Sequence, residues 1–345
     1  MLRQLWTVTR GTFTESIRQP IFLVMMMVCL IWLVMLMKLS QFSMDPWSDD
    51  DRLMVNQGLS ALGFFGLLLA CFTSAGVLSR EIDNKTVLTV ISKPIGRPIF
   101  VAGKFLGVAA AIALVFWVWL IALLMLVRHG VVATGSDQTD WVVITFATGA
   151  LAVAAAISVW GNYFYNWVFT STFIIATAVA APIAYLLILL INDKWEFQSI
   201  ATEFTQENIV ITQVVIASAL VLEGLLILTA VAVACSTRLG VVMTLLITAA
   251  VAGLGLCSDY MVGGTAERSL WLDSGTVSGD WPLIIGAKVG YAIIPNIQIF
   301  WVADALTQRN AVAMGYLGIV TVYAALFVVA ALGVAVALFQ TRETG

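Results

Sequence analysis

Eight long apolar runs limit what this chain can fold into. Each approaches or exceeds the roughly 20 residues that an α-helix needs to cross the hydrocarbon core of a bilayer. Only 11% of the 345 residues are charged and 61% are hydrophobic, whereas about a quarter of the residues in soluble domains are charged. The predicted spans are 21–39, 58–78, 99–127, 142–160, 171–191, 212–234, 241–257 and 315–339. The sequence predicts an all-α, polytopic transmembrane helical bundle of about eight spans, with residues 1–345 in a single transmembrane domain.

The charges between the spans indicate an orientation. With the N-terminus inside, the cytoplasmic pieces carry ten basic and four acidic residues, whereas the longer outer pieces carry seven basic and fifteen acidic ones. The cytoplasmic pieces are 1–20, 79–98, 161–170, 235–240 and 340–345. Basic residues concentrate in the cytoplasmic loops of helical membrane proteins, and reversing the chain or dropping one span spoils this sorting. We therefore expect both termini in the cytoplasm.

Residues 1–20 have the pattern of an amphipathic helix lying on the membrane surface. Four apolar side chains form one stripe: Leu2, Trp6, Phe13 and Ile17. Three basic side chains line the polar side: Arg3, Arg10 and Arg18. Helices of this kind lie in the plane of the interface. The first long apolar run has no small-residue cleavage site after it, so we expect no cleavable signal peptide.

One further apolar stretch, 281–302, is a candidate for a ninth span. Lys288 and the Pro295-Asn296 break argue against a span, and an odd number of spans would move the C-terminus outside. We expect a helix or a re-entrant pair at the outer face, within an exoplasmic region 258–314 that precedes the last span. Irregular backbone there must be covered by protein or reach water.

The segment from Ser79 to Lys104, "SREIDNKTVLTVISKPIGRPIFVAGK", connects two spans and is basic on balance. Its first half has the spacing of a short amphipathic helix, with Ile82 and Val87 on the apolar side. Pro94 ends that helix, because proline disfavours the α conformation of the residue before it. Pro98 suits the first turn of the next helix, where a missing N–H is tolerated. The pattern predicts a short surface helix, a turn and re-entry into the membrane.

This segment resembles the coupling helix of permease (membrane-spanning) subunits of type-2 ABC exporters. The shared pattern is an acidic residue, Thr plus an aliphatic residue, "SKPIGR" and then "GK", and the stretches "TRGTFTESIRQPIF" and "LFQTRE" also agree. Many members of that family have Gly where this chain has Lys85. In the family, the coupling helix docks on a separate ATP-hydrolysing subunit. The resemblance implies an ATPase-coupling role for these residues: Arg80, Glu81, Thr86, Val87, Pro94, Arg97 and Lys104.

The resemblance also implies the partners and the location. We expect an ABC ATPase (nucleotide-binding) subunit, a second permease protomer that is identical or different, and the lipid bilayer of the bacterial cytoplasmic (inner) membrane. ATP and Mg²⁺ would bind the ATPase, because "GRPIFVAGK" lacks the first glycine of a phosphate loop and Phe105 follows Lys104. We therefore expect no cofactor and no enzymatic activity in this chain.

Other kinds of site find little support in the sequence. The chain has one histidine, His129, and four cysteines without metal-ligand spacing, so we expect no metal site. A net charge of -3 gives no reason to expect nucleic acid as a partner. No candidate catalytic residue stands out.

Three intramembrane features are candidates for function or packing. Glu223 lies near the middle of span 212–234, where a charge costs about 2.5–3.5 kcal/mol. It either lines the transport route or couples its motion, or it makes a structural hydrogen bond to a neighbouring Ser, Thr or Tyr. Lys104 either extends its ammonium group to the cytoplasmic interface or contacts substrate. Gly103 and Gly107 have GxxxG spacing, which permits close helix packing.

The predicted function is that of the permease subunit of an ATP-driven ABC exporter whose substrate is open. One alternative is a stand-alone secondary transporter or channel, which predicts interrupted helices at matching places in two halves. A membrane-embedded enzyme would require acid, base or nucleophile residues that converge at one depth, and none is visible.

Overall fold

The protein folds as a bundle of helices. The structure, a computed structural model, describes residues 1–39, 50–83, 96–130, 139–199, 209–266, 280–307 and 311–340. Within these residues, eight helices are long and apolar enough to cross a membrane, and each coincides with one predicted span. The prediction of a polytopic helical bundle is therefore confirmed.

The long helices follow one another along the chain. They are α2 (Pro20–Leu39), α3 (Asp50–Asp83), α5 (Arg97–His129), α6 (Trp141–Tyr165), α7 (Phe169–Leu190), α9 (Ile209–Ser236), α10 (Val241–Ser258) and α14 (Met314–Gln340). The shorter elements are α1 (Leu2–Arg18), the π-helix η3 (Asp259–Gly263), α11 (Gly264–Ala266), α12 (Trp281–Ile293), the 3-10 helix η4 (Gln298–Phe300) and α13 (Ala303–Thr307).

Local sequence explains where several helices begin and end. Gln19 is extended, with φ -70° and ψ 134°, because it precedes Pro20; this residue separates α1 from α2. Helix α5 begins after Gly96 and has Pro98 in its first turn, as the sequence predicts. The side chain of Asp140 accepts hydrogen bonds from two backbone N–H groups in the first turn of α6, which is the usual role of an N-cap aspartate.

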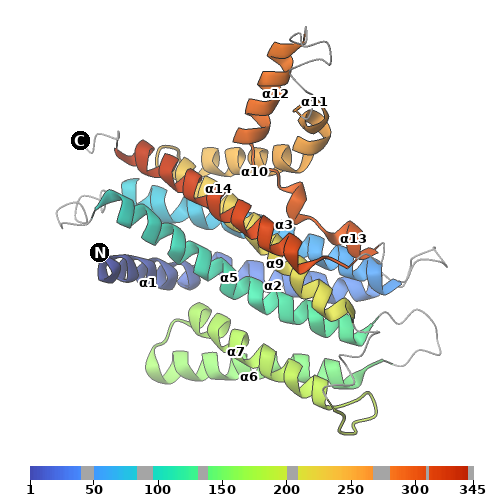
Figure 1. Cartoon of the computed structure of the whole chain (residues 1–345). Coiled ribbons are helices and arrows are strands. Elements are labelled where there is room, and N and C mark those ends of the chain that lie inside the picture. The colour runs from blue at the N-terminus through green and yellow to red at the C-terminus, as the bar shows by residue number, and fades with distance from the viewer. Residues whose placement is uncertain are drawn as a thin grey trace.

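Helices α5 and α9 are the most buried spans and form the centre of the bundle together with α3. The fully buried Trp119 of α5 donates a hydrogen bond from Nε1 to the carbonyl oxygen of Met26 in α2, at 3.2 Å. Helices α6 and α7 form a hairpin on one side of this centre, and α10, α11 and α12 lie on the other side (Figure 1). Helix α12 points away from the bundle, and most of its large apolar side chains are exposed.

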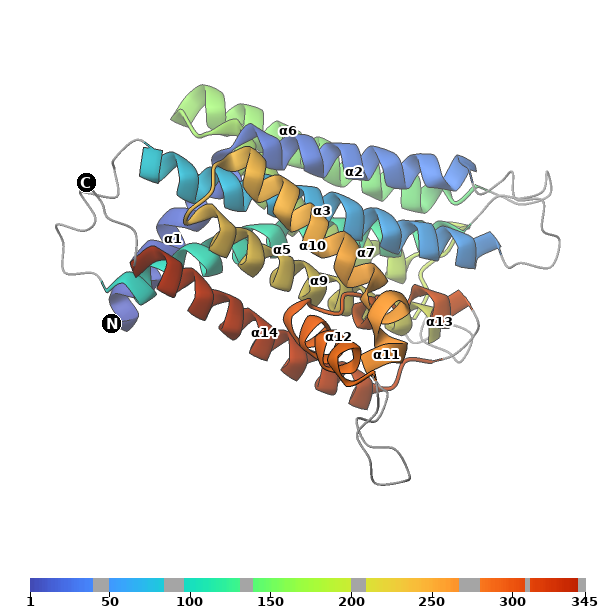
Figure 2. The same ribbon diagram turned by 90° about the horizontal axis from the view of Figure 1, so that it is seen from above.

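The pieces predicted to be cytoplasmic gather at one end of the bundle. Both views place α1, the end of α3, the start of α5 and the end of α14 at this end (Figures 1 and 2). The α6–α7 and α9–α10 connections lie at the same end. The structure thus places the described parts of these five pieces at one end, in agreement with their sorting by charge.

The segment 281–302 does not form a ninth long helix. Helix α12 has 13 residues and ends at Ile293, and the extended Ile294 precedes Pro295. The chain then continues as irregular backbone and packs against Gly63 and Gly224, which lie near the middle of the apolar windows of α3 (Leu53–Ser74) and α9 (Ile211–Ser236). We name residues 295–302 the wedge, because they lie between spans and two of them, Phe300 and Trp301, contact glycines near the span centres.

The backbone of the wedge has hydrogen-bond partners, as irregular backbone at this depth requires. The N–H of Ile297 donates to the carbonyl oxygen of Gly255 in α10, at 3.1 Å. The side chain of Asn296, which is 5% exposed, receives a hydrogen bond from the N–H of Gln298 at 3.0 Å and donates to the Tyr291 hydroxyl at 2.9 Å. The N–H of Asn296 donates to the Tyr323 hydroxyl of α14, at 3.0 Å.

Helix α1 packs on the bundle by a face other than the predicted apolar stripe. Ile17 is buried and Phe13 is half-buried, but Leu2 and Trp6 are 83% and 66% exposed. The buried face consists of small and hydroxyl side chains that include Thr12 and Ser16. The stripe is therefore split between the protein and its surroundings, because α5 offers a surface of glycines to the more polar side of α1.

Candidate coupling and transport sites

The residues assigned to ATPase coupling begin in the last turns of α3. Arg80 and Glu81 are helical, so residues 79–83 continue the span directly. Thr86, Val87 and Pro94 lie outside the described residues, as does most of the predicted short surface helix; its first residues, up to Asp83, belong to α3. The chain is described again from Gly96, at the start of α5. The structure therefore fixes both flanks of the coupling segment.

Arg97, the first residue of α5, contacts the last residue of α14. Its Nη1 donates a hydrogen bond to the carbonyl oxygen of Gln340, at 2.8 Å. The final carbonyl groups of a helix have no intrahelical partner and carry partial negative charge, which favours a cation there. The rings of Phe100 and Phe339 stack one turn away, with centroids 5.8 Å apart. The start of α5 thus holds the end of α14.

Lys104 points toward α1. Its side chain is 7% exposed, and its Nζ lies 3.7 Å from Glu15 Oε2. The same ammonium group lies 5.7 Å from the centroid of the Phe100 ring, within range of a cation–π interaction. A buried cation is costly unless it is paired, so Glu15 and Phe100 explain how Lys104 is accommodated two turns after the start of α5. This arrangement links α1 to α5.

Gly103 and Gly107 lie where α5 meets α1. A Cβ atom added at Gly103 would lie 2.8 Å from side-chain atoms of Val8. A Cβ atom at Gly107 would lie 2.5 Å from Thr12 Cβ and 2.7 Å from the carbonyl oxygen of Thr9. Only glycine permits backbones to approach this closely. The start of α5 therefore contacts both α1 and α14, next to the coupling segment.

Glu223 faces the last span. Thr321 of α14 donates a hydrogen bond to Glu223 Oε1, at 2.6 Å, and its hydroxyl oxygen lies 2.8 Å from the carbonyl oxygen of Leu317. A threonine hydroxyl has one hydrogen, so Glu223 Oε1 and the Leu317 carbonyl oxygen share it. If the Glu223 carboxyl group is protonated, it can instead donate its own hydrogen to the Thr321 hydroxyl. Glu223 Oε2 is buried and has no hydrogen-bond partner among the described residues. Glu223 thus makes the structural hydrogen bond that was one of the two alternatives from the sequence. Its second carboxyl oxygen, Oε2, remains for another contact.

We expect Thr321→Val to destabilise the protein by about 0.5–1.5 kcal/mol, the net contribution of a typical hydrogen bond, because Glu223 is half-buried and Thr321 is exposed on the surface of the bundle. The loss should vanish in a Glu223→Leu background, where no carboxyl group needs a partner. Thermal unfolding of the four proteins of this double-mutant cycle in one detergent measures the coupling. Equal destabilisation in both backgrounds would show that the hydrogen bond does not stabilise the bundle.

A cavity of about 390 Å³ lies between α3, α9, α10 and the wedge. Gly63, Gly224 and Ala252 make room for it, and Phe300 and Trp301 of the wedge form one wall. Its one hydroxyl, Ser60, donates to the carbonyl oxygen of Asn56 at 2.8 Å. The cavity is therefore apolar. Glu223 is next to Gly224 in sequence but contacts α14.

Sequence reasoning missed both this cavity and the wedge. Gly63, Gly224 and Gly255 were signals, because a glycine in a span often marks a close approach of another backbone. They could not be singled out among the 26 glycines of the chain. The polar side chains Asn296 and Tyr323 gave no distinct pattern either, because 27 residues separate them.

Comparison with protein families identifies the chain. A family model described as ABC-2 family transporter protein matches residues 6–192, which is more than half of the 345 residues. The chain belongs to the ABC-2 transporter family. A comparison with curated proteins finds no relative that matches. As an ABC-2 family member, the protein is a membrane transport permease, and the predicted resemblance is confirmed.

The match divides this ABC-2 family member into two parts. It covers α1 to α7 and so includes the flanks of the coupling segment, Lys104 and the α1–α5 contact. The wedge, Glu223 and Thr321 lie beyond the matched residues. The matched residues therefore include the α1–α5 contact, whereas the wedge, the Glu223–Thr321 hydrogen bond and most residues that line the cavity lie outside them.

Proposed function

We propose that this chain is the permease subunit of an ATP-driven ABC exporter and couples to a separate ATPase through residues 79–98. ATP and Mg²⁺ would bind the ATPase, and two permease protomers, identical or different, would pair in the bacterial inner membrane. In this proposal the end of the bundle that holds α1 faces the cytoplasm. The excess of basic residues at that end supports this orientation.

The observation that carries the proposal is the arrangement around the coupling segment. Arg97, near the end of the segment, donates a hydrogen bond to the end of α14, and Lys104 pairs with Glu15 of α1. Movement of the segment on nucleotide binding would therefore reach the first and the last helix through α5. A nucleotide-bound ATPase that prefers one position of the segment would shift the bundle toward one conformation.

We expect Glu81→Ala and Arg97→Glu to lower co-purification of the ATPase without blocking membrane insertion. The experiment is a pull-down in mild detergent from the native membrane, followed by measurement of ATP hydrolysis in the isolated complex. An effect on the order of tenfold in ATPase recovery corresponds to about 1.4 kcal/mol of binding. Lys194→Glu is the control, because Lys194 is exposed in the α7–α9 connection, at the opposite end of the bundle.

ATPase recovery that is the same for wild type and both variants would contradict coupling through this segment. Full transport by the purified chain, driven by an ion gradient without an ATPase, would favour the secondary-transporter alternative. That alternative predicts interrupted helices in matching halves. The described residues contain the wedge near the C-terminal end of the chain and no matching segment before α7.

A further inference from the structure

The outward face of α1 is a basic surface. Arg3, Thr7, Arg10, Thr14 and Arg18 follow one another at spacings of three and four residues, which places them on one side of a helix. The three arginines and Thr7 are exposed. The two threonine hydroxyls donate to the carbonyl oxygens of Arg3 and Arg10, at 2.8 and 2.9 Å. We name these five residues the basic face.

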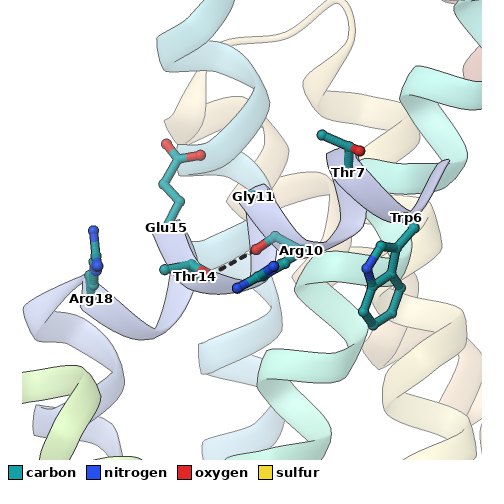
Figure 3. A pocket seen from close by; sticks show the side chains of 7 residues that line it. All are labelled: Trp6, Thr7, Arg10, Gly11, Thr14, Glu15 and Arg18. Atoms are coloured by element: carbon teal, nitrogen blue, oxygen red, sulfur yellow. Dashed lines mark hydrogen bonds between the residues drawn. The ribbon is translucent and has the colours of Figure 1, made fainter. Parts of the chain in front are cut away.

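A hollow of about 610 Å³ lies along this face, between Trp6 at one end and Arg18 at the other (Figure 3). Arg10 lies between them, and Gly11 adds to the opening because a Cβ atom there would meet nothing within 4 Å. The Trp6 indole and two guanidinium groups thus border the same hollow, together with the carboxylate of Glu15. Such a site suits a ligand that has an anionic group joined to an apolar part.

No ion pair within the described part of the chain neutralises the basic face. Glu15 is the one acidic residue between 1 and 20, and its carboxylate lies 3.7 Å from Lys104 Nζ of α5. Among the described residues, no carboxylate is recorded within ion-pair distance of Arg3, Arg10 or Arg18. Three positive charges are therefore available to a partner.

The position of α1 matches the headgroup layer of a bilayer. Its inner face packs on Gly103 and Gly107, one to three turns from the start of α5 at Arg97. Figure 2 shows that α1 crosses the end of the bundle rather than continuing along a span. Trp6 and Leu2 are exposed beside the arginines, and tryptophan is enriched where hydrocarbon meets headgroups.

We propose that the basic face binds the phosphate groups of anionic phospholipids, with Arg10 and Arg18 on the phosphates and Trp6 at the boundary of the acyl chains. Guanidinium groups match phosphate geometry through paired N–H donors. Electrostatic attraction of each basic residue near an anionic membrane corresponds to about a fivefold change in affinity. This binding goes beyond the transport role and is independent of coupling to an ATPase.

The test is titration of the purified full-length protein in neutral detergent with phosphatidylglycerol, with phosphatidylcholine and with inorganic phosphate, followed by native mass spectrometry. We expect wild type to bind phosphatidylglycerol more tightly than phosphatidylcholine, and inorganic phosphate not to compete. Arg10→Gln and Arg18→Gln should each weaken phosphatidylglycerol binding about fivefold, and the double variant about 25-fold. Binding that inorganic phosphate abolishes would mean a free-anion site and would overturn the proposal.

Lys194→Gln/Lys288→Gln is the charge-matched control, because it removes two exposed positive charges away from α1 and should leave phosphatidylglycerol binding unchanged. If the double arginine variant fails to fold, phosphatidylglycerol binding by the two single variants tests the proposal. Equal binding of the two lipids by wild type, or equal phosphatidylglycerol binding by wild type and the arginine variants, would overturn the proposal. If the arginine variants lose a co-purified ATPase but bind phosphatidylglycerol as wild type does, the basic face binds the ATPase and not lipid.

Discussion

Gly107→Val is expected to separate α1 from α5 and to destabilise the protein strongly. A Cβ atom at this position would lie 2.7 Å from the carbonyl oxygen of Thr9 and 2.9 Å from the backbone nitrogen of Phe13. These are backbone atoms of a helix, so they cannot move aside as the end of a side chain can. Overpacking usually costs about 1–3 kcal/mol, and we expect the upper end of that range or more.

Two measurements test the Gly107 prediction. Thermal unfolding in detergent reports the loss of stability. Trypsin cleavage after Arg10 or Arg18 reports local opening of α1, because a protease requires an unfolded segment. Gly149→Val is the control, since Gly149 lies within α6 and a Cβ atom there meets nothing within 4 Å. Stability and cleavage like those of wild type in the Gly107 variant would show that α1 does not pack on α5 as described.

Gly255→Val is expected to displace the wedge from the bundle. A Cβ atom at Gly255 would lie 2.5 Å from the carbonyl oxygen of Pro295 and 2.6 Å from Ile297 Cγ1. The variant would also break the hydrogen bond from Ile297 N–H to the Gly255 carbonyl oxygen, because the two backbones could not stay at that distance. Displacement of the wedge would remove the wall that Phe300 and Trp301 give to the apolar cavity. We expect a loss of stability of about 3 kcal/mol or more, from overpacking and lost burial together.

A disulfide between the wedge and α9 would report this displacement directly. A Cβ atom at Gly224 would lie 3.4 Å from Phe300 Cβ, close to the spacing that a disulfide requires. In a background without the native cysteines, Gly224→Cys/Phe300→Cys should form a crosslink, and Gly255→Val should reduce its yield severalfold. Gly253→Val is the control on the same helix, because a Cβ atom there meets nothing within 4 Å. An unchanged yield with Gly255→Val would contradict the packing described for the wedge.

The spans could be predicted because length and apolar composition suffice to define them. The end of the bundle at which each described connection lies could also be predicted, because it follows from the charges next to each span in the sequence. Partners across the bundle could not be predicted in the same way. Thr321 lies 98 residues from Glu223, and nothing in the sequence distinguishes it from the other hydroxyl residues that could reach the same depth.

The packing of α1 shows a second limit of sequence reasoning. An amphipathic pattern predicts which face avoids water, but it does not say whether lipid or protein covers that face. The face that packs on α5 contains Val8 and Thr12, because two glycines allow helices to approach where larger side chains would keep them apart. The wedge was missed for a related reason. Its apolar composition fits a span, a surface helix or a buried loop equally well. The wedge is buried because glycines of the surrounding helices leave room for it.

The contact between α1 and α5 also constrains the order of events during biosynthesis. Val8 leaves the ribosome long before Gly103, by roughly 5–20 s at the usual rate of about 5–20 residues per second. Throughout this interval α1 has no glycine surface to pack on, so the newly made helix must wait on the membrane with Trp6, Phe13 and Ile17 turned toward lipid. The amphipathic stripe, which the finished protein only partly exposes, would therefore act as a temporary anchor until the third span is made and α1 can pack on its glycines.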